Sequence, residues 1–190
     1  MQETFMTTHV AVLVGSLRKA SVTRTLSRAL AELAPEGLQL SAVEIGEMQF
    51  YNPDLDEASP PASWQAFRDR IRGSDGVLFV TPEYNRSVPA VLKNALDVGS
   101  RPGGKNVWAG KPAAVISASR GALGGFGANH HLRQSLVCLD VPVLQQPEAY
   151  LGDAYNLFDD DGKLANETTL AFLSTFMEKF AAWIATNRRT

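Results

Sequence analysis

The sequence predicts an α/β fold in which helices cover both faces of a parallel sheet, and two patterns carry that prediction. Short, unbroken apolar runs rich in β-branched residues recur along the 190 residues, as is typical of strands covered on both faces. Segments with helical apolar spacing separate these runs. Because parallel strands need crossover connections, five alternations of strand and helix indicate a doubly wound sheet.

The clearest strands are expected at residues 10–14 (VAVLV), 77–80 (VLFV) and 113–116 (AAVI). Residues 38–43 (LQLSAV) alternate in polarity, which favours an edge strand with one wetter face. Residues 141–144 (VPVL) are a short candidate for the fifth strand.

Apolar residues at helical spacing predict five helices, at residues 22–33, 64–71, 89–98, 128–139 and 170–184. The first pattern ends before Pro35, and Pro89 suits the first turn of the third helix. The stripe of Leu170, Leu173, Met177, Phe180 and Ile184 in the last helix indicates core packing.

This alternation matches a flavodoxin-like sheet with strand order 2-1-3-4-5, in which ligands bind between the loops after the first and third strands. We expect a flexible N-terminal tail over residues 1–8 and a single flavodoxin-like domain over residues 9–188. No repeat or linker interrupts the pattern.

Composition excludes several classes of function. The formal net charge is −2 and the basic residues form no sustained run, which argues against a nucleic-acid partner. No segment has the length of a signal peptide or of a membrane span, so we expect a cytoplasmic protein without a membrane partner. The single cysteine, Cys138, rules out an internal disulfide and is expected to be a small buried side chain on a helix.

Hydroxyl and basic side chains follow the first strand directly. Gly15 lets the chain turn, Ser16, Ser21 and Thr23 bring hydroxyl groups to the start of a helix, and Arg18 adds a cation. This loop predicts a phosphate site, although Ser21 as a simple helix cap and Arg18 as a surface base is an open alternative. Since neither GxGxxG nor a Walker A motif is present, a monophosphate fits best.

Polar and aromatic residues also follow the third strand. Pro82 stiffens the chain there, while Glu83, Tyr84 and Asn85 offer a flat ring and polar edges suited to an aromatic heterocycle. A surface turn is the alternative. After the fourth strand, residues 117–127 (SASRGALGGFG) are rich in glycine, which predicts either close approach to a ligand or a flexible loop.

Three other motifs suggest a ligand or metal site, but their sequence context argues against it. Residues 99–106 (GSRPGGKN) resemble a P-loop but follow a helix, and residues 159–162 (DDDG) lack the spacing of a calcium loop. His130 and His131 are adjacent on a predicted helix and point to different faces, so no metal site is expected.

The sequence resembles the NADPH-dependent FMN reductase family, most closely its chromate and quinone reductase branch. The matching stretches are GSLRKAS (15–21), PEYNRSVP (82–89), LKNALD (92–97), GG (124–125) and HLRQ (131–134). The resemblance implies a flavodoxin-like fold, non-covalent FMN, NADPH or NADH as hydride donor, and a quinone, chromate, azo compound or flavin as small-molecule acceptor. It also implies a homodimer or homotetramer.

Carried over by position, the resemblance assigns the phosphate to Ser16, Arg18, Ser21 and Thr23, the isoalloxazine to Pro82, Glu83, Tyr84 and Asn85, and its other side to Ser117 and Gly121. The sequence departs from the family at Thr23, where Asn is frequent, and at Ala90 and Val98. Because FMN carries the chemistry, no catalytic side chain is assigned. A non-enzymatic flavodoxin-type electron-transfer protein is the alternative, and an interaction protein that has kept only the fold is a further one.

Overall fold

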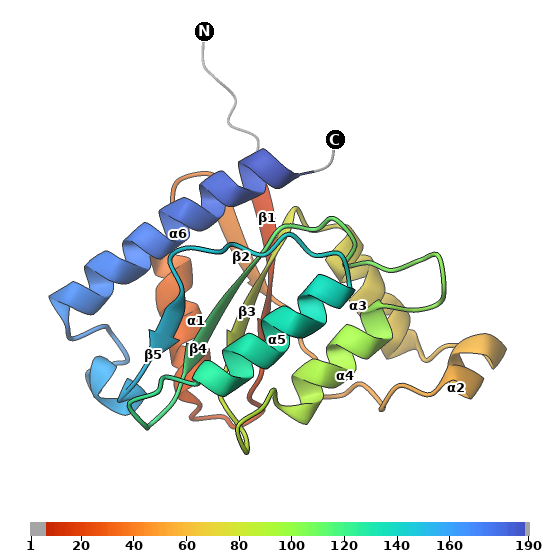
Figure 1. Cartoon of the computed structure of the whole chain (residues 1–190), viewed down its shortest axis with the longest axis horizontal. Helices are drawn as coiled ribbons and strands as arrows, with labels where there is room; N and C mark the ends of the chain where they lie inside the picture. Colours follow the sequence, from red (N-terminus) through yellow and green to blue (C-terminus); the bar gives the residue numbers. More distant parts are fainter. Residues whose placement is uncertain (1–6, 189–190) are drawn as a thin grey trace, which may run out of the picture.

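Five parallel strands form the centre of the computed structural model, which describes residues 7–188 (Figure 1). The strands are β1 (Thr8–Val14), β2 (Leu38–Ala42), β3 (Gly76–Thr81), β4 (Ala113–Ala118) and β5 (Ala149–Leu151). They pair in the order β2-β1-β3-β4-β5, and every pair is parallel. The predicted flavodoxin-like order is therefore confirmed.

The helices are α1 (Val22–Glu32), α2 (Pro53–Ala58), α3 (Ala62–Arg72), α4 (Ala90–Gly99), α5 (Phe126–Cys138) and α6 (Glu167–Asn187), with one 3₁₀ turn, η1 (Ala154–Leu157). The five expected helices are present. The sequence analysis missed α2 and η1, which are too short to show apolar periodicity. Figure 1 shows α2 at the periphery of the molecule, beyond α3 and α4.

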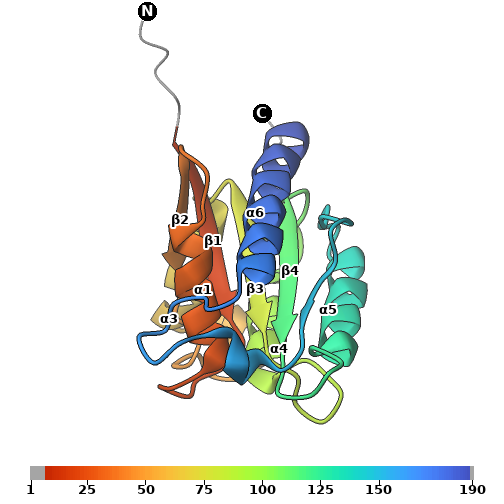
Figure 2. The same cartoon turned by 90° about the vertical axis from the view of Figure 1, so that its left-hand side faces the viewer.

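Successive residues of each strand point to opposite faces of the sheet and pack into two separate hydrophobic cores. Val10, Val12 and Val14 of β1 pack with α1 and α6, whereas Ala11 and Leu13 pack with α3, α4 and α5. Figure 2 shows these two helical layers on opposite faces of the sheet. β3 and β4 are buried along their whole length and β1 is buried from Val10 to Val14, and their sequences are mainly apolar, as is typical of parallel strands.

The prediction for the fifth strand is wrong. Residues 141–144 make only an isolated bridge, between Val143 and Ala113 at the start of β4, and β5 lies further on at Ala149–Leu151. Pro142 has no N–H to donate to a ladder. Only after Pro147 does the chain return to β4, where Ala149 pairs with Ile116.

Three other expectations need correction. Cys138 is exposed, not buried, because α5 buries the face that carries Leu132 and Leu136, and Cys138 lies on the opposite side. Leu170 is 43% exposed, and the buried stripe of α6 begins at Leu173. The expected tail lies mostly outside the described residues, but Thr8 at its end already belongs to β1.

The carboxyl ends of the strands point away from the two chain termini, and the loops after β1 and β3 gather there in both views (Figures 1 and 2). This end of the sheet is where a ligand site is expected in an open α/β fold. Within residues 7–188, none of the helices combines the length and the apolar character that crossing a membrane requires.

Candidate functional site

The loops after β1 and β3 are in direct contact. The N–H of Gly15 donates to the carbonyl oxygen of Val80 at 2.9 Å. A Cβ atom on Gly15 would lie 3.0 Å from Cδ of Pro82 and 3.1 Å from Oγ1 of Thr81, so this junction has room for little beyond glycine. The two loops thus form one continuous surface at the switch point of the sheet.

Buried hydroxyl groups surround the N-terminus of α1. Ser16, Ser21 and Thr23 are all buried, and Oγ of Ser21 lies 2.7 Å from Oγ1 of Thr23. Ser21 is the N-cap of α1, yet its side chain makes no cap hydrogen bond, and the first turn carries no acidic residue. The N–H groups of the first turn and the helix dipole therefore favour an anion here, which is the charge that the predicted phosphate site requires.

Arg18 and Arg24 lie close to this helix terminus, and Arg120 contacts the same tyrosine ring as Arg18. Arg18 donates from Nε and Nη2 to the carbonyl oxygen of Ala20, at 3.2 and 2.6 Å. Its guanidinium carbon lies 6.0 Å from the ring of Tyr155 in η1, and that of Arg120 lies 4.7 Å from the same ring. Arg24 donates from Nε to the carbonyl oxygen of Ser16 at 3.3 Å. Sequence reasoning missed Arg24, although it directly follows Thr23. It also missed Arg120 and Tyr155, which only the fold brings close to the loop after β1.

A tight two-residue turn shapes the loop after β3. Tyr84 and Ser87 exchange backbone hydrogen bonds of 3.1 and 3.0 Å, and Asn85 and Arg86 between them have φ values of 50° and 64°. Two central residues with positive φ are the mark of a type I′ turn, in which Asn is favoured. The turn directs the hydroxyl of Tyr84 toward Oγ of Ser16, at 3.4 Å, and so links the two loops.

Glu83 holds two elements together. Its Oε2 accepts a hydrogen bond from the N–H of Ala128 in the first turn of α5 at 3.0 Å, and Oε1 lies 3.6 Å from Nη1 of Arg86. The side chain is 12% exposed. Since α5 has glycine as its N-cap, Glu83 supplies the missing cap from another loop. Its carboxylate is therefore occupied, while its backbone groups lie in the loop that faces Ser16.

Hydrogen bonds and packing within the protein fix the loop after β4. Oγ of the buried Ser117 donates to the carbonyl oxygen of Gly124 at 2.7 Å and accepts from Nδ2 of Asn129 at 3.2 Å. A Cβ atom on Gly124, whose φ is 59°, would lie 2.6 Å from the carbonyl carbon of Tyr150. Glycine at position 124 thus permits close contact with β5, whereas Gly121 has no neighbour within 4 Å of a Cβ atom.

A cavity of about 410 Å³ opens beside these loops. Its wall is mainly apolar and aromatic, and its main side-chain contributors are Leu17, Met48, Phe50, Tyr84, Pro89 and Val91. Arg18 and Asn94 are the polar side chains that line it. A volume of this size lies within the range of small-molecule pockets. The segment after β2, which supplies Met48 and Phe50, carried no functional signal in the sequence.

The motifs rejected from the sequence have structural roles. Residues 100–106 form the loop that follows α4, and Oδ1 of Asp159 accepts backbone hydrogen bonds from Asp161 and Lys163 within a turn. His130 contacts the hydroxyl of Tyr150 and His131 that of Ser87, so the two rings point to different neighbours. The described residues contain no group of three or more potential metal ligands.

These features fit a phosphomonoester that carries a planar ring. Hydroxyl groups, open N–H groups and arginines meet at the start of α1, and an apolar cavity with a tyrosine ring lies next to them. The combination defines a flavodoxin-like protein with a site suited to FMN.

Comparison with known proteins gives the family. The model of the NADPH-dependent FMN reductase family matches residues 8–156, and the chain belongs to this family.

Its relatives agree in length and sequence. The chain is 62% identical over 179 residues to a quinone reductase of Pseudomonas putida, which covers 94% of this chain and 96% of that one. It is 45% identical over 183 residues to a 2-hydroxy-1,4-benzoquinone reductase of a Burkholderia species, which covers 96% and 100%. Among solved structures, the flavoenzyme NAD(P)H:(acceptor) oxidoreductase FerB of Paracoccus denitrificans superposes with a TM-score of 0.91 at 41% identity, covering 96% of this chain and all of that one.

Proposed function

We propose that this protein is an FMN-dependent NAD(P)H oxidoreductase that reduces quinones. One observation carries the proposal. A helix N-terminus suited to a phosphate lies next to an apolar cavity at the switch point of the sheet, in a chain that belongs to the NADPH-dependent FMN reductase family. Overall, NAD(P)H, one proton and one quinone give NAD(P)⁺ and one hydroquinone. Bound FMN supplies the hydride chemistry, and the protein supplies binding and orientation.

Each side of the site has a separate task in this proposal. Ser16, Ser21, Thr23 and Arg18 hold the phosphate at the start of α1. The loop Pro82–Asn85 would line the ring system. The backbone N–H groups of Glu83 and Asn85 would stabilise negative charge on the reduced ring, since Pro82 has no N–H and that of Tyr84 donates to Ser87. The segment around Ser117 and Gly121 borders the far side. Glu83 and Ser117 act through their backbone or as supports, because their side chains are already hydrogen-bonded.

We further propose a cytoplasmic protein that works as a homodimer or homotetramer. Supporting the assembly, Leu123, Phe126 and Val137 on and before α5 are 60%, 50% and 75% exposed. Exposed apolar side chains of this kind are available for a contact between subunits. Sedimentation of the purified protein measures the mass, and a monomer at micromolar concentration would contradict this part of the proposal.

A visible spectrum and one anaerobic titration test the function. The purified protein should be yellow, or should become so with added FMN. NADPH without oxygen should bleach the flavin, and a quinone should then restore its colour. A protein that binds no FMN refutes the proposal, whereas one that binds FMN but is not reduced by NADPH or NADH is an electron-transfer protein instead.

A further inference from the structure

The segment after β2 holds an exposed aromatic side chain on an unusually fixed backbone. Phe50 is 74% exposed and lines the cavity together with Met48. On either side of it, Asn94 of α4 donates from Nδ2 to the carbonyl oxygen of Gln49 at 2.9 Å and accepts at Oδ1 from the N–H of Tyr51 at 2.8 Å. One buried amide thus bonds to both backbone groups that flank Phe50, as a neighbouring strand would.

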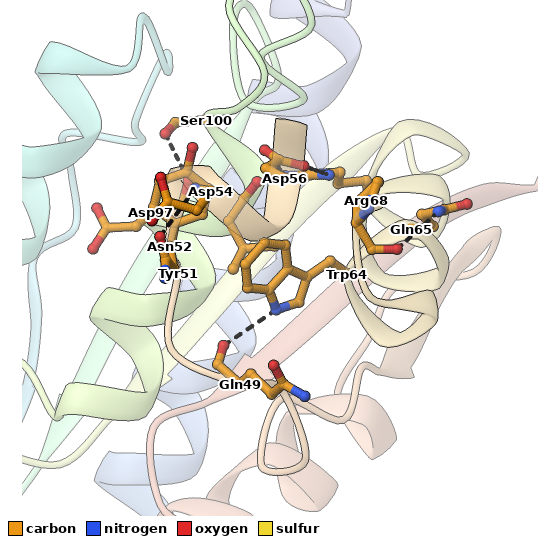
Figure 3. Close-up of polar contacts among 12 residues, drawn as sticks. Gln49, Tyr51, Asn52, Asp54, Asp56, Trp64, Gln65, Arg68, Asp97 and Ser100 are labelled. Carbon is orange, nitrogen blue, oxygen red and sulfur yellow. Dashed lines mark hydrogen bonds and ion pairs between the residues drawn. The ribbon is translucent and has the colours of Figure 1, made fainter. Parts of the chain in front are cut away.

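Further contacts fix the same segment. Nε1 of Trp64 also donates to the carbonyl oxygen of Gln49, at 3.2 Å, and the rings of Tyr51 and Trp64 lie 5.5 Å apart (Figure 3). Beyond them, the buried pair of Asp56 and Arg68 holds α2 against α3 with two bonds of 2.8 Å. A segment anchored at so many points keeps Phe50 at the rim of the cavity instead of letting its ring move freely with a loop.

The cavity that Phe50 borders offers apolar and aromatic surface but few free polar groups. Both ends of the Asn94 amide are engaged, and Arg18 donates to Ala20. None of the side chains that line the cavity is acidic. The mainly apolar lining suits an uncharged planar ring, which can stack on the face of Phe50.

We propose that Phe50 is a specificity-determining residue that packs against the ring of the electron acceptor, and that Asn94 is the residue that positions it. This inference rests on the proposed function and adds to it the wall of the site that selects apolar planar acceptors over small hydrophilic ones. The acceptor contacts the part of the cavity formed by the segment after β2, which borders the residues assigned to FMN.

The test compares two acceptors with the FMN-loaded protein and NADPH. 1,4-Naphthoquinone is apolar and planar, and ferricyanide is a compact hydrophilic anion, two of which accept the electrons of one NADPH. Phe50→Ala should raise KM for naphthoquinone about tenfold, through the lost ring contact, and leave kcat, the ferricyanide kinetics and FMN affinity unchanged. Phe50→Tyr, which keeps the ring, should restore the KM.

Two further variants complete the design. Leu55 of α2 belongs to the same segment, is 38% exposed and lies outside the cavity lining. Leu55→Ala should therefore leave KM and kcat for both acceptors unchanged. Asn94→Asp keeps the acceptor for the N–H of Tyr51 but places an oxygen against the carbonyl of Gln49. It should therefore raise KM for naphthoquinone while the ferricyanide kinetics stay unchanged.

Several results would overturn the inference. Equal effects of Phe50→Ala on both acceptors, or no effect on either, would remove the selective role. Weaker FMN binding with an unchanged KM would assign this wall to the flavin, and a smaller assembly in sedimentation would assign it to a subunit contact. If the wild-type protein binds no FMN or does not oxidise NADPH, the proposed function itself has failed, which is known before any variant is compared.

Discussion

Arg18, which we propose to hold the FMN phosphate, is held in place by hydrogen bonds within the protein. Its Nε and Nη2 atoms bond to the carbonyl oxygen of Ala20, which fixes the guanidinium close to the N-terminus of α1. Arginine presents several donors in a rigid fork, so bonds to a backbone oxygen leave others for a phosphate. The arrangement therefore reduces the conformational entropy that Arg18 loses when an anion binds.

Replacing Arg18 should weaken FMN binding selectively. Arg18→Ala is expected to cost roughly 1.5 to 3 kcal/mol of FMN binding free energy, the range for a hydrogen bond to a charged group. Lys19→Ala removes the same charge from the adjacent exposed position and should cost far less. Fluorescence titration with FMN measures both, and equal losses would show that Arg18 acts only through long-range charge.

Gly124 lies in a glycine-rich loop where the sequence predicts a ligand contact or flexibility, but its lack of a side chain allows close packing against the backbone of Tyr150. Gly124→Ala would push its Cβ atom into the backbone of Tyr150 and place a side chain at a φ of 59°, so we expect a loss of about 1 to 3 kcal/mol in the free energy of unfolding. Gly121→Ala, with open space around it, should change stability by less than about 0.5 kcal/mol. Urea denaturation of both variants measures the two losses, and equal stabilities would show that Gly124 does not pack closely against Tyr150.

At the scale of elements, α2 is an exposed helix that depends on one buried ion pair. None of its residues is buried as a whole, yet the side chains of Asp56 and Arg68 are only 3% and 4% exposed and form two bonds of 2.8 Å. Nε of Arg68 also donates to the carbonyl oxygen of Val98, so Arg68 joins α2 and α4 to α3. The local sequence also favours this helix, because Asn52 is its N-cap and Pro53 lies in its first turn.

Breaking this pair should destabilise the protein strongly. Asp56→Ala leaves the guanidinium of Arg68 buried without its counter-ion, for which we expect a loss of about 3 to 5 kcal/mol in unfolding free energy. Asp69→Ala breaks the exposed pair of Asp69 and Arg72 and should cost less than about 1 kcal/mol. Urea denaturation compares the two, and similar losses would mean that burial does not set the strength of the Asp56 pair.

For the whole molecule, Tyr150 contributes to the pH dependence of stability in the alkaline range. Burial, then a hydrogen bond to Glu148 and the charge of that carboxylate, raises the pKa of Tyr150 to about 12 from its ordinary value of 10.0. The folded protein keeps this proton where the unfolded chain has lost it. Tyr150 therefore contributes stability that is complete below pH 10 and is lost as the pH rises to about 12.

The Tyr150→Phe variant should remove this part of the pH dependence. Burial lowers the pKa of Lys111, which has the opposite effect on stability at lower pH, so the difference between wild type and variant is the quantity to measure. Thermal unfolding between pH 9 and about pH 12 should show a shallower decline for Tyr150→Phe. Tyr155→Phe serves as the control, and an identical decline in all three proteins would contradict the assignment.

The alternation of strands and helices, both core layers and the helix terminus at Ser21 follow from the sequence, because apolar periodicity is a local pattern. The strand order follows from the match of this alternation to a flavodoxin-like fold. The residues of the loops after β1 and β3 could likewise be located, since the carboxyl ends of parallel strands meet at one edge. Only the tertiary structure places β5 at Ala149–Leu151, pairs Asp56 with Arg68, and brings Phe50 to the cavity. These features depend on contacts between residues distant in sequence, and no local pattern encodes which distant group a side chain meets.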